Sequence, residues 1–314
     1  MSTALPPTRA MLTGAKIAGV LIVPLVAAVL LAGGGAILAA TMGLLTVTAV
    51  VFCDLRQSAL LLAGVALTGL LATASYGHPV AVVSVVVATC LLAGLMSRFS
   101  AGVYGVAPIV ASVLALSPPQ QSPWAVAAVI AAVGIYVVVV VTLLKVHLDP
   151  QPVPWEVAVR HAVVMAVACG GAAAVAVHYL WPKSYWLVMT LAIVLRPYAT
   201  ESLVKNRRRV VGTLVGAVVA AALSPLPRPL QVVFAALCLT LVLAYAMEQN
   251  YVLQVTFSTP LVVFLVSSGA VDDTLSMDGL RVLYTVGAAV IGGVVSLALA
   301  RDATPASSGP SSNG

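Results

Sequence analysis

Long apolar runs, separated by short breaks, fill the chain from about residue 16 to about residue 300. The breaks are glycine and proline turn-formers, such as Gly33-Gly34-Gly35 and Ser117-Pro118-Pro119. A run such as VVVVVTLL (137–144) lacks the polar–apolar alternation of a transmembrane barrel, so the pattern predicts helices. We predict twelve spans, at about 16–33, 36–52, 57–75, 79–96, 101–117, 124–144, 161–179, 184–196, 209–223, 229–246, 251–268 and 280–300.

The composition shows which solvent these helices meet. Of the 314 residues, 61% are hydrophobic and 8% are charged, against about 25% charged in soluble domains. The mean hydropathy is +1.12. Only lipid can cover so much apolar surface, which predicts an all-α, polytopic helical membrane protein. The first run lacks a cleavage site followed by a soluble domain, so we expect it to stay as a helix.

The positive charges divide unequally between the two sides of the predicted membrane. With a cytoplasmic N-terminus, twelve of the fifteen Lys and Arg residues fall on the cytoplasmic side. The three others, Lys183, Arg228 and Arg281, fall outside. This asymmetry predicts a multi-pass protein of the plasma (inner) membrane with both termini in the cytoplasm. It also explains the net charge of +6 without a nucleic-acid partner.

The two halves of the chain resemble each other weakly. Gly43 to Thr46 lines up with Leu187 to Thr190, Gly64 with Gly212, and Pro108 with Pro260. Six spans per half would give two parallel repeats with a pathway at their interface. The predicted organisation is a cytoplasmic N-terminus (1–15), a first six-helix repeat (16–144), a cytoplasmic linker (145–160), a second repeat (161–300) and a disordered cytoplasmic tail (301–314).

A basic elbow interrupts the apolar pattern between Arg196 and Arg209, with five cations in fourteen positions. It can be a topology determinant that faces anionic lipid headgroups. It can also be an anion-binding site at the inner mouth of a pathway, because guanidinium groups bind carboxylates bidentately. Arg196 and Arg209 border apolar spans, where a cation is costly unless it faces protein or a cavity. The substrate-binding candidates here are Arg196, Lys205, Arg208 and Arg209.

The polar residues after position 247 are the second candidate region. We expect Gln254, Thr256 and Ser258 to line the pathway in a span kinked at Pro260, although hydrogen bonding between helices explains them equally well. Glu248 is a candidate for proton coupling. The predicted structural residues, which include glycines that allow close helix packing, are Gly64, Gly212, Gly216, Pro108 and Pro260.

Enzyme chemistry finds little support. The four histidines and four cysteines show no metal-ligand spacing, and no HExxH or phosphate-cradling motif is present. We therefore expect no catalytic residues, metal or cofactor. The aromatic residues near span ends, Trp186 among them, are typical of interfacial anchors. Asp272, Asp273 and Asp278 are predicted to form a solvated outer loop.

The elbow and its flanks, YWLVMTLAIVLRPYATESLVKNRRRVVGTLVGA (185–217), resemble the fusaric-acid-resistance-like family of aromatic acid exporters. The residues that carry this resemblance are Trp186, Thr190, Pro197, Arg209, Gly212-Thr213, Gly216, Tyr251, Thr259 and Pro260. It implies efflux of aromatic or other organic acids. The membrane region of plant aluminium-activated malate channels looks similar.

Many bacterial members of that family carry a large cytoplasmic domain that this sequence lacks. We therefore expect either a partner, such as a second copy in a homo-oligomer or an accessory subunit, or a minimal two-repeat form. The sequence thus predicts a permease that exports organic acids. Its expected partners are the lipid bilayer, in which it is embedded, and a small organic anion, which it binds as substrate. The alternatives are a passive organic-anion channel and an intramembrane enzyme or scaffold.

Overall fold

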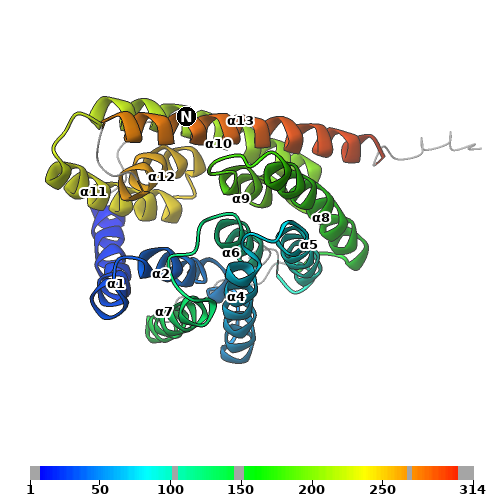
Figure 1. The fold of residues 1–314 in the computed structure, drawn as a ribbon, viewed down its shortest axis with the longest axis horizontal. Coiled ribbons are helices and arrows are strands. Elements are labelled where there is room, and N and C mark those ends of the chain that lie inside the picture. The colour runs from blue at the N-terminus through cyan, green and yellow to red at the C-terminus, as the bar shows by residue number, and fades with distance from the viewer. Residues whose placement is uncertain (1–7, 101–104, 145–151, 267–270, 303–314) are drawn as a thin grey trace, which may run out of the picture.

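The computed structural model describes residues 8–100, 105–144, 152–266 and 271–302, all of whose regular structure is helical (Figure 1). This confirms the all-α prediction. In chain order the helices are α1 (Thr8–Ala32), α2 (Ala36–Leu45), α3 (Val47–Val50), α4 (Leu55–Ser75), α5 (Pro79–Met96), α6 (Val106–Ala115), α7 (Pro123–Leu143), α8 (Trp155–His178), α9 (Tyr185–Val194), α10 (Ala199–Leu223), α11 (Arg228–Met247), α12 (Tyr251–Val266) and α13 (Val271–Asp302).

Six helices of this described part are long and apolar enough to cross a membrane, namely α4, α5, α7, α8, α11 and α13. Shorter apolar helices include α6 and α9, which have ten residues each. Such a helix extends about 15 Å, or half of a bilayer core. The chain is a multi-pass membrane protein that combines full-length and half-length helices.

Several helices begin and end where the sequence supplies the required turn chemistry. Asp54 and Gln57 form a reciprocal capping box at the start of α4. Pro79 and Pro123 occupy the first turns of α5 and α7, where the missing N–H has no cost. Gly33, between α1 and α2, has a φ angle of +80°, which favours glycine.

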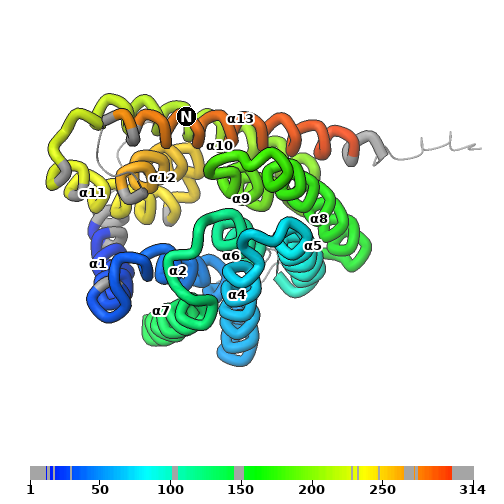
Figure 2. The backbone as a smooth tube through the Cα atoms, in the orientation of Figure 1, coloured from blue at the N-terminus to red at the C-terminus, as the bar shows by residue number. Residues whose placement is uncertain are grey.

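The first helix of each half packs against the other half of the chain. α1 lies against α11, and α8 lies against α5 (Figures 1 and 2). Inside the first half, α4 packs on α6 and α7, and α2 packs on α7. Inside the second half, α10 packs on α12 and α13, and α9 packs on α13. Each half thus contributes one helix to its neighbour.

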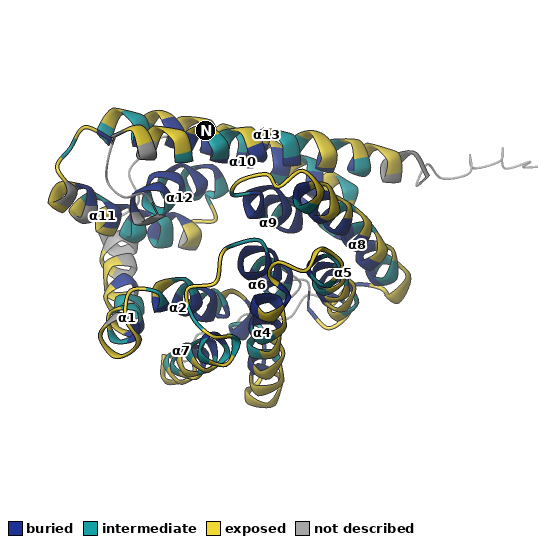
Figure 3. Cartoon of the chain, in the orientation of Figure 1, coloured by how far each residue is buried: buried dark blue, intermediate teal, exposed yellow. Residues whose placement is uncertain are grey.

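Buried residues are concentrated toward the middle of this assembly, and exposed residues toward its outside (Figure 3). The largest buried cluster joins residues of α2, α5, α6, α8 and α9, among them Val110 and Leu191. Large apolar side chains such as Val167, Val218 and Val290 are exposed on the outside. An apolar exterior of this kind suits contact with lipid tails.

Glycines allow close helix contact at some of the expected positions. A Cβ added to Gly212 would lie 2.7 Å from the carbonyl oxygen of Val252. One added to Gly216 would collide with the carbonyl oxygen of Thr256, so α10 and α12 approach closely at both. A Cβ added to Gly64 would have no neighbouring atom within 4 Å, so the predicted close packing there is wrong. Gly69, five residues further along α4, packs against Ile130 instead.

Four helices begin at least six residues earlier than the hydropathy pattern predicts, the first of them α1, which begins at Thr8 instead of near residue 16. The basic elbow forms the first turns of α10, which begins at Ala199, and α8 begins at Trp155 inside the predicted linker. α13 begins at Val271, so the predicted acidic loop is helical and Asp278 is buried. Apolar runs mark where lipid contact begins, whereas charged residues such as Arg, Lys and Glu are good helix formers. The linker at 145–151, the N-terminal residues 1–7 and the tail from 303 lie outside the described residues.

Candidate functional site

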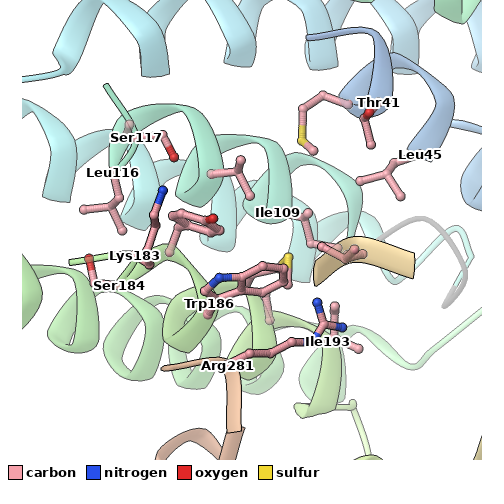
Figure 4. Close-up of a pocket in the computed structure, with 18 of the residues that line it drawn as sticks. Thr41, Leu45, Ile109, Leu116, Ser117, Lys183, Ser184, Trp186, Ile193 and Arg281 are labelled. Atoms are coloured by element: carbon pink, nitrogen blue, oxygen red, sulfur yellow. The ribbon is translucent and has the colours of Figure 1, made fainter. Parts of the chain in front are cut away.

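A cavity of about 2010 Å³ lies between helices of the two halves (Figure 4). Its walls come mainly from α2, α6, α9, α10 and α12, with single residues from α3 and α13 and two each from α5 and α8. On α6 the lining runs from Gly105, just before the helix, to Pro118, beyond its end. On α9 it runs from Ser184 to Arg196. The cavity therefore extends along the whole length of both half-length helices.

The charged side chains that line this cavity are almost all positive. The described lining contains six cations: Lys183, Arg196, Lys205, Arg208, Arg209 and Arg281. Its one carboxylate is Glu201, which is exposed. In a chain with 8% charged residues, this concentration gives the cavity a positive potential that attracts anions.

Arg196 sits in an extended break between α9 and α10. Its backbone N–H donates a hydrogen bond of 2.8 Å to the hydroxyl of buried Ser202. That hydroxyl also lies 3.2 Å from the carbonyl oxygen of Tyr198. One serine thus fixes the break, and the half-buried Arg196 lines the cavity at this point.

Arg209 lies further along α10 and is only 8% exposed. Its Nη1 donates a hydrogen bond of 3.2 Å to the hydroxyl of Tyr251, and its buried Nε has no hydrogen-bond partner. The ammonium of Lys205 lies 5.3 Å from the centre of the Tyr251 ring. Burial, and to a smaller extent the charge of Arg209, lower the pKa of Lys205 to about 7. These three residues form a cationic cluster where α10 and α12 begin.

Arg281 joins the cavity wall from α13, although the sequence pattern placed it on the outer side of the membrane. It is 4% exposed, and its guanidinium carbon lies 4.4 Å from the centre of the Trp186 ring. Trp186 is 7% exposed, so its prediction as an interfacial anchor is also wrong. A signal in the sequence could have revealed Arg281: with Asp278 and Tyr284 it recurs every three residues, which places all three on one helix face.

The predicted pathway residues of α12 divide between two faces. Gln254 and Ser258, four residues apart, both line the cavity. Thr256 lies between them in sequence and is turned toward α10, where its carbonyl oxygen meets Gly216. Its hydroxyl donates to the carbonyl oxygen of Val252 at 3.0 Å. Since Thr256 is absent from the cavity lining, its predicted role there is wrong.

Two further predicted residues have clear positions. Glu248 is exposed at the end of α11 and does not line the cavity. Pro260 lies inside α12, which continues through it, and Pro108 is buried near the start of α6. No group of three His, Cys, Asp or Glu side chains in the described residues is arranged to hold a metal ion.

These features define a multi-pass helical membrane protein with a cation-lined cavity between its halves. Residues 169–299 match the family model described as fusaric acid resistance protein-like. This match, over less than half of the chain, confirms the resemblance found in the sequence. The match includes α9 to α12 and thus the basic elbow. No curated protein and no solved structure matches the chain.

Proposed function

We propose that the protein is an inner-membrane permease that exports organic acids, aromatic acids among them, with both termini in the cytoplasm. The observation that carries this proposal is the cavity lined by six cations and one carboxylate. A buried arginine in a membrane protein is costly unless it serves a pathway or meets a counter-charge. A negatively charged cargo supplies that counter-charge while it passes.

The proposed architecture is twelve spans in two six-helix repeats with exchanged first helices. α1 to α7 would correspond to α8 to α13, with α2 and α3 together matching α9. Under this correspondence the contacts of α4 with α6 and α7 match those of α10 with α12 and α13. The contact of α1 with α11 matches that of α8 with α5. Pathways at repeat interfaces are common in transporters, and the cavity lies at this one.

The residues would act in sequence along the cavity. Arg196, Lys205 and Arg208 would attract an acid to the end of the cavity where α10 begins, and Arg209 would bind its carboxylate. Gln254 and Ser258 would then offer hydrogen bonds to polar groups of the acid. Glu248 remains a candidate for proton coupling, from an exposed position near the same end. A second copy of the chain or an accessory subunit would complete the assembly.

The test is a flux assay in proteoliposomes with benzoate, succinate and tetramethylammonium, with and without a proton gradient. We expect saturable flux of the two carboxylates above protein-free vesicles and none of the cation. A dependence on the gradient would support proton coupling, and Glu248→Gln should then remove it. If neither carboxylate crosses faster than in empty vesicles, the export proposal is wrong.

A passive anion channel is the second candidate, favoured by a cavity that runs along the full length of α6 and α9. A channel and a permease would differ in turnover, because a channel passes ions without a conformational cycle. Recordings in planar bilayers with symmetrical benzoate separate them. Unitary currents that require Arg196 support the channel, whereas silent bilayers combined with saturable vesicle flux support the permease.

A further inference from the structure

We propose that Arg281 and Trp186 form a second carboxylate-binding subsite, at the end of the cavity where α9 begins. This inference rests on the proposed function, since it assumes that organic acids enter the cavity. It assigns a role to a residue that the charge pattern of the sequence placed outside the membrane. The first subsite is the cluster of Arg209, Lys205 and Tyr251 where α10 and α12 begin.

Arg281 lines the cavity and has one guanidinium nitrogen without a hydrogen-bond partner. The residue is 4% exposed and lines the cavity, yet its buried Nη1 makes no hydrogen bond. An unpaired buried guanidinium nitrogen is costly, because water is removed and nothing replaces it. A carboxylate oxygen is the acceptor that a guanidinium binds best.

The surroundings hold Arg281 in place before any ligand arrives. Its guanidinium lies against the Trp186 ring, which covers part of it and orients its edge (Figure 4). One turn later, the hydroxyl of Tyr284 donates a hydrogen bond of 2.7 Å to the carbonyl oxygen of Pro182. This bond ties α13 to the segment that leads into α9, so the subsite needs little rearrangement to bind.

The chemistry of the wall favours an organic carboxylate over an inorganic anion. Ile109, Met189, Ile193 and Val262 line the same cavity and offer apolar surface to the body of an acid. The carboxylate of Asp278, three residues before Arg281 on the same helix, acts on Arg281 less strongly than the positive charge of Arg209 does, so Arg281 retains a positive potential for an acid.

Tryptophan fluorescence tests the subsite directly. Trp124, Trp155 and Trp181 are all at least 41% exposed, and their replacement by Phe leaves Trp186 as the one tryptophan of the chain, which can be excited selectively over tyrosine. Titration with acetate and with cyclohexanecarboxylate, neither of which absorbs at tryptophan wavelengths, should shift its emission saturably. Cyclohexanecarboxylate should bind more tightly, and chloride at matched ionic strength should produce no saturable shift. Arg281→Gln should abolish the carboxylate response, whereas Arg281→Lys should retain it with weaker binding.

Flux measurements supply a second readout that does not depend on the triple Phe background. For benzoate we expect Arg281→Gln to raise the half-saturating concentration at least about tenfold, a loss of roughly 1.4 kcal/mol. Arg56→Gln is the matched control, because Arg56 is exposed and does not line the cavity. It should behave like the wild type.

The outcomes separate the two proposals. If the wild type passes carboxylates but Arg281→Gln has unchanged emission shifts and half-saturation, the subsite is wrong and the permease stands. If the wild type passes no carboxylate, the proposed function itself fails. If Arg281→Gln does not insert into the membrane, Arg281→Lys decides between the two roles. A subsite predicts that this variant binds carboxylates more weakly than the wild type, whereas a purely structural cation predicts unchanged binding.

Discussion

Arg209 donates a hydrogen bond from Nη1 to the hydroxyl of Tyr251 at 3.2 Å, across 42 residues of sequence. The bond joins α10 to α12 and orients a buried guanidinium whose Nε is unpaired. The same tyrosine ring lies 5.3 Å from the ammonium of Lys205. One aromatic side chain therefore positions two cations of the cavity.

Tyr251→Phe would remove the hydrogen-bond acceptor and keep the ring. We expect the half-saturating benzoate concentration to rise by roughly three- to tenfold, because the guanidinium loses an orienting bond and binding loses part of the about 1.5–3 kcal/mol of a hydrogen bond to a charged group. Vesicle flux checks this. Tyr136→Phe is the control, since the Tyr136 hydroxyl binds the Val20 carbonyl away from the cavity. An equal effect of both substitutions would contradict a specific role for Tyr251.

Arg196→Ala should lower benzoate flux by at least about tenfold while membrane insertion is retained. The side chain borders the cavity at the break between α9 and α10, and the substitution removes its charge and its hydrogen-bond donors. The backbone bonds to Ser202 that fix the break remain available. Flux at equal protein content measures the effect, with Arg56→Ala as the exposed control. Unchanged flux in Arg196→Ala would remove this residue from the pathway.

Much of the fold and part of the site could be predicted from the sequence, because lipid imposes a strong pattern. The apolar runs and the breaks between them predicted a helix in nearly every segment that is helical in the structure. The basic elbow drew attention to Arg196, Lys205, Arg208 and Arg209, which all line the cavity. A cation beside an apolar span is unusual enough to be informative on its own.

The sequence-based predictions that failed were those that depend on helix register and on contacts between distant segments. The predicted span began at residue 280 and left Arg281 at its outer end, whereas the helix already begins at Val271 and Arg281 lines the cavity. Thr256 differs from Gln254 by two positions, which in a helix turns a side chain to another face. Gly64 and Gly69 are both small, and only the packing of α7 on α4 decides which one is in contact.

Gly216→Ala should destabilise the protein by about 1–3 kcal/mol, the usual cost of overpacking. The new Cβ would meet backbone oxygen of Thr256 and lie 2.7 Å from the Cβ of Thr259, so α10 and α12 must move apart. Gly64→Ala is the matched control and should stabilise the protein by up to about 1 kcal/mol, because Ala is the better helix former and space is free. Thermal unfolding in detergent measures both, and equal melting temperatures would refute the close contact.

Anion binding should weaken as pH rises through about 7. Lys205 lies in the charged first turns of α10, and burial together with the charge of Arg209 lowers its pKa to about 7. A lysine is protonated below its pKa, so Lys205 carries its charge at about pH 6 and has lost most of it at about pH 8. Benzenesulfonate, which keeps its charge over this range, is the suitable probe. Its half-saturating concentration should rise several-fold from about pH 6 to about pH 8.

Two variants of Lys205 test whether this residue causes the pH dependence. Lys205→Arg should remove the dependence because a guanidinium stays charged, and Lys205→Met should show weak binding at both pH values. A wild-type profile that is flat over this range, or one that Lys205→Arg leaves unchanged, would show that another group controls binding.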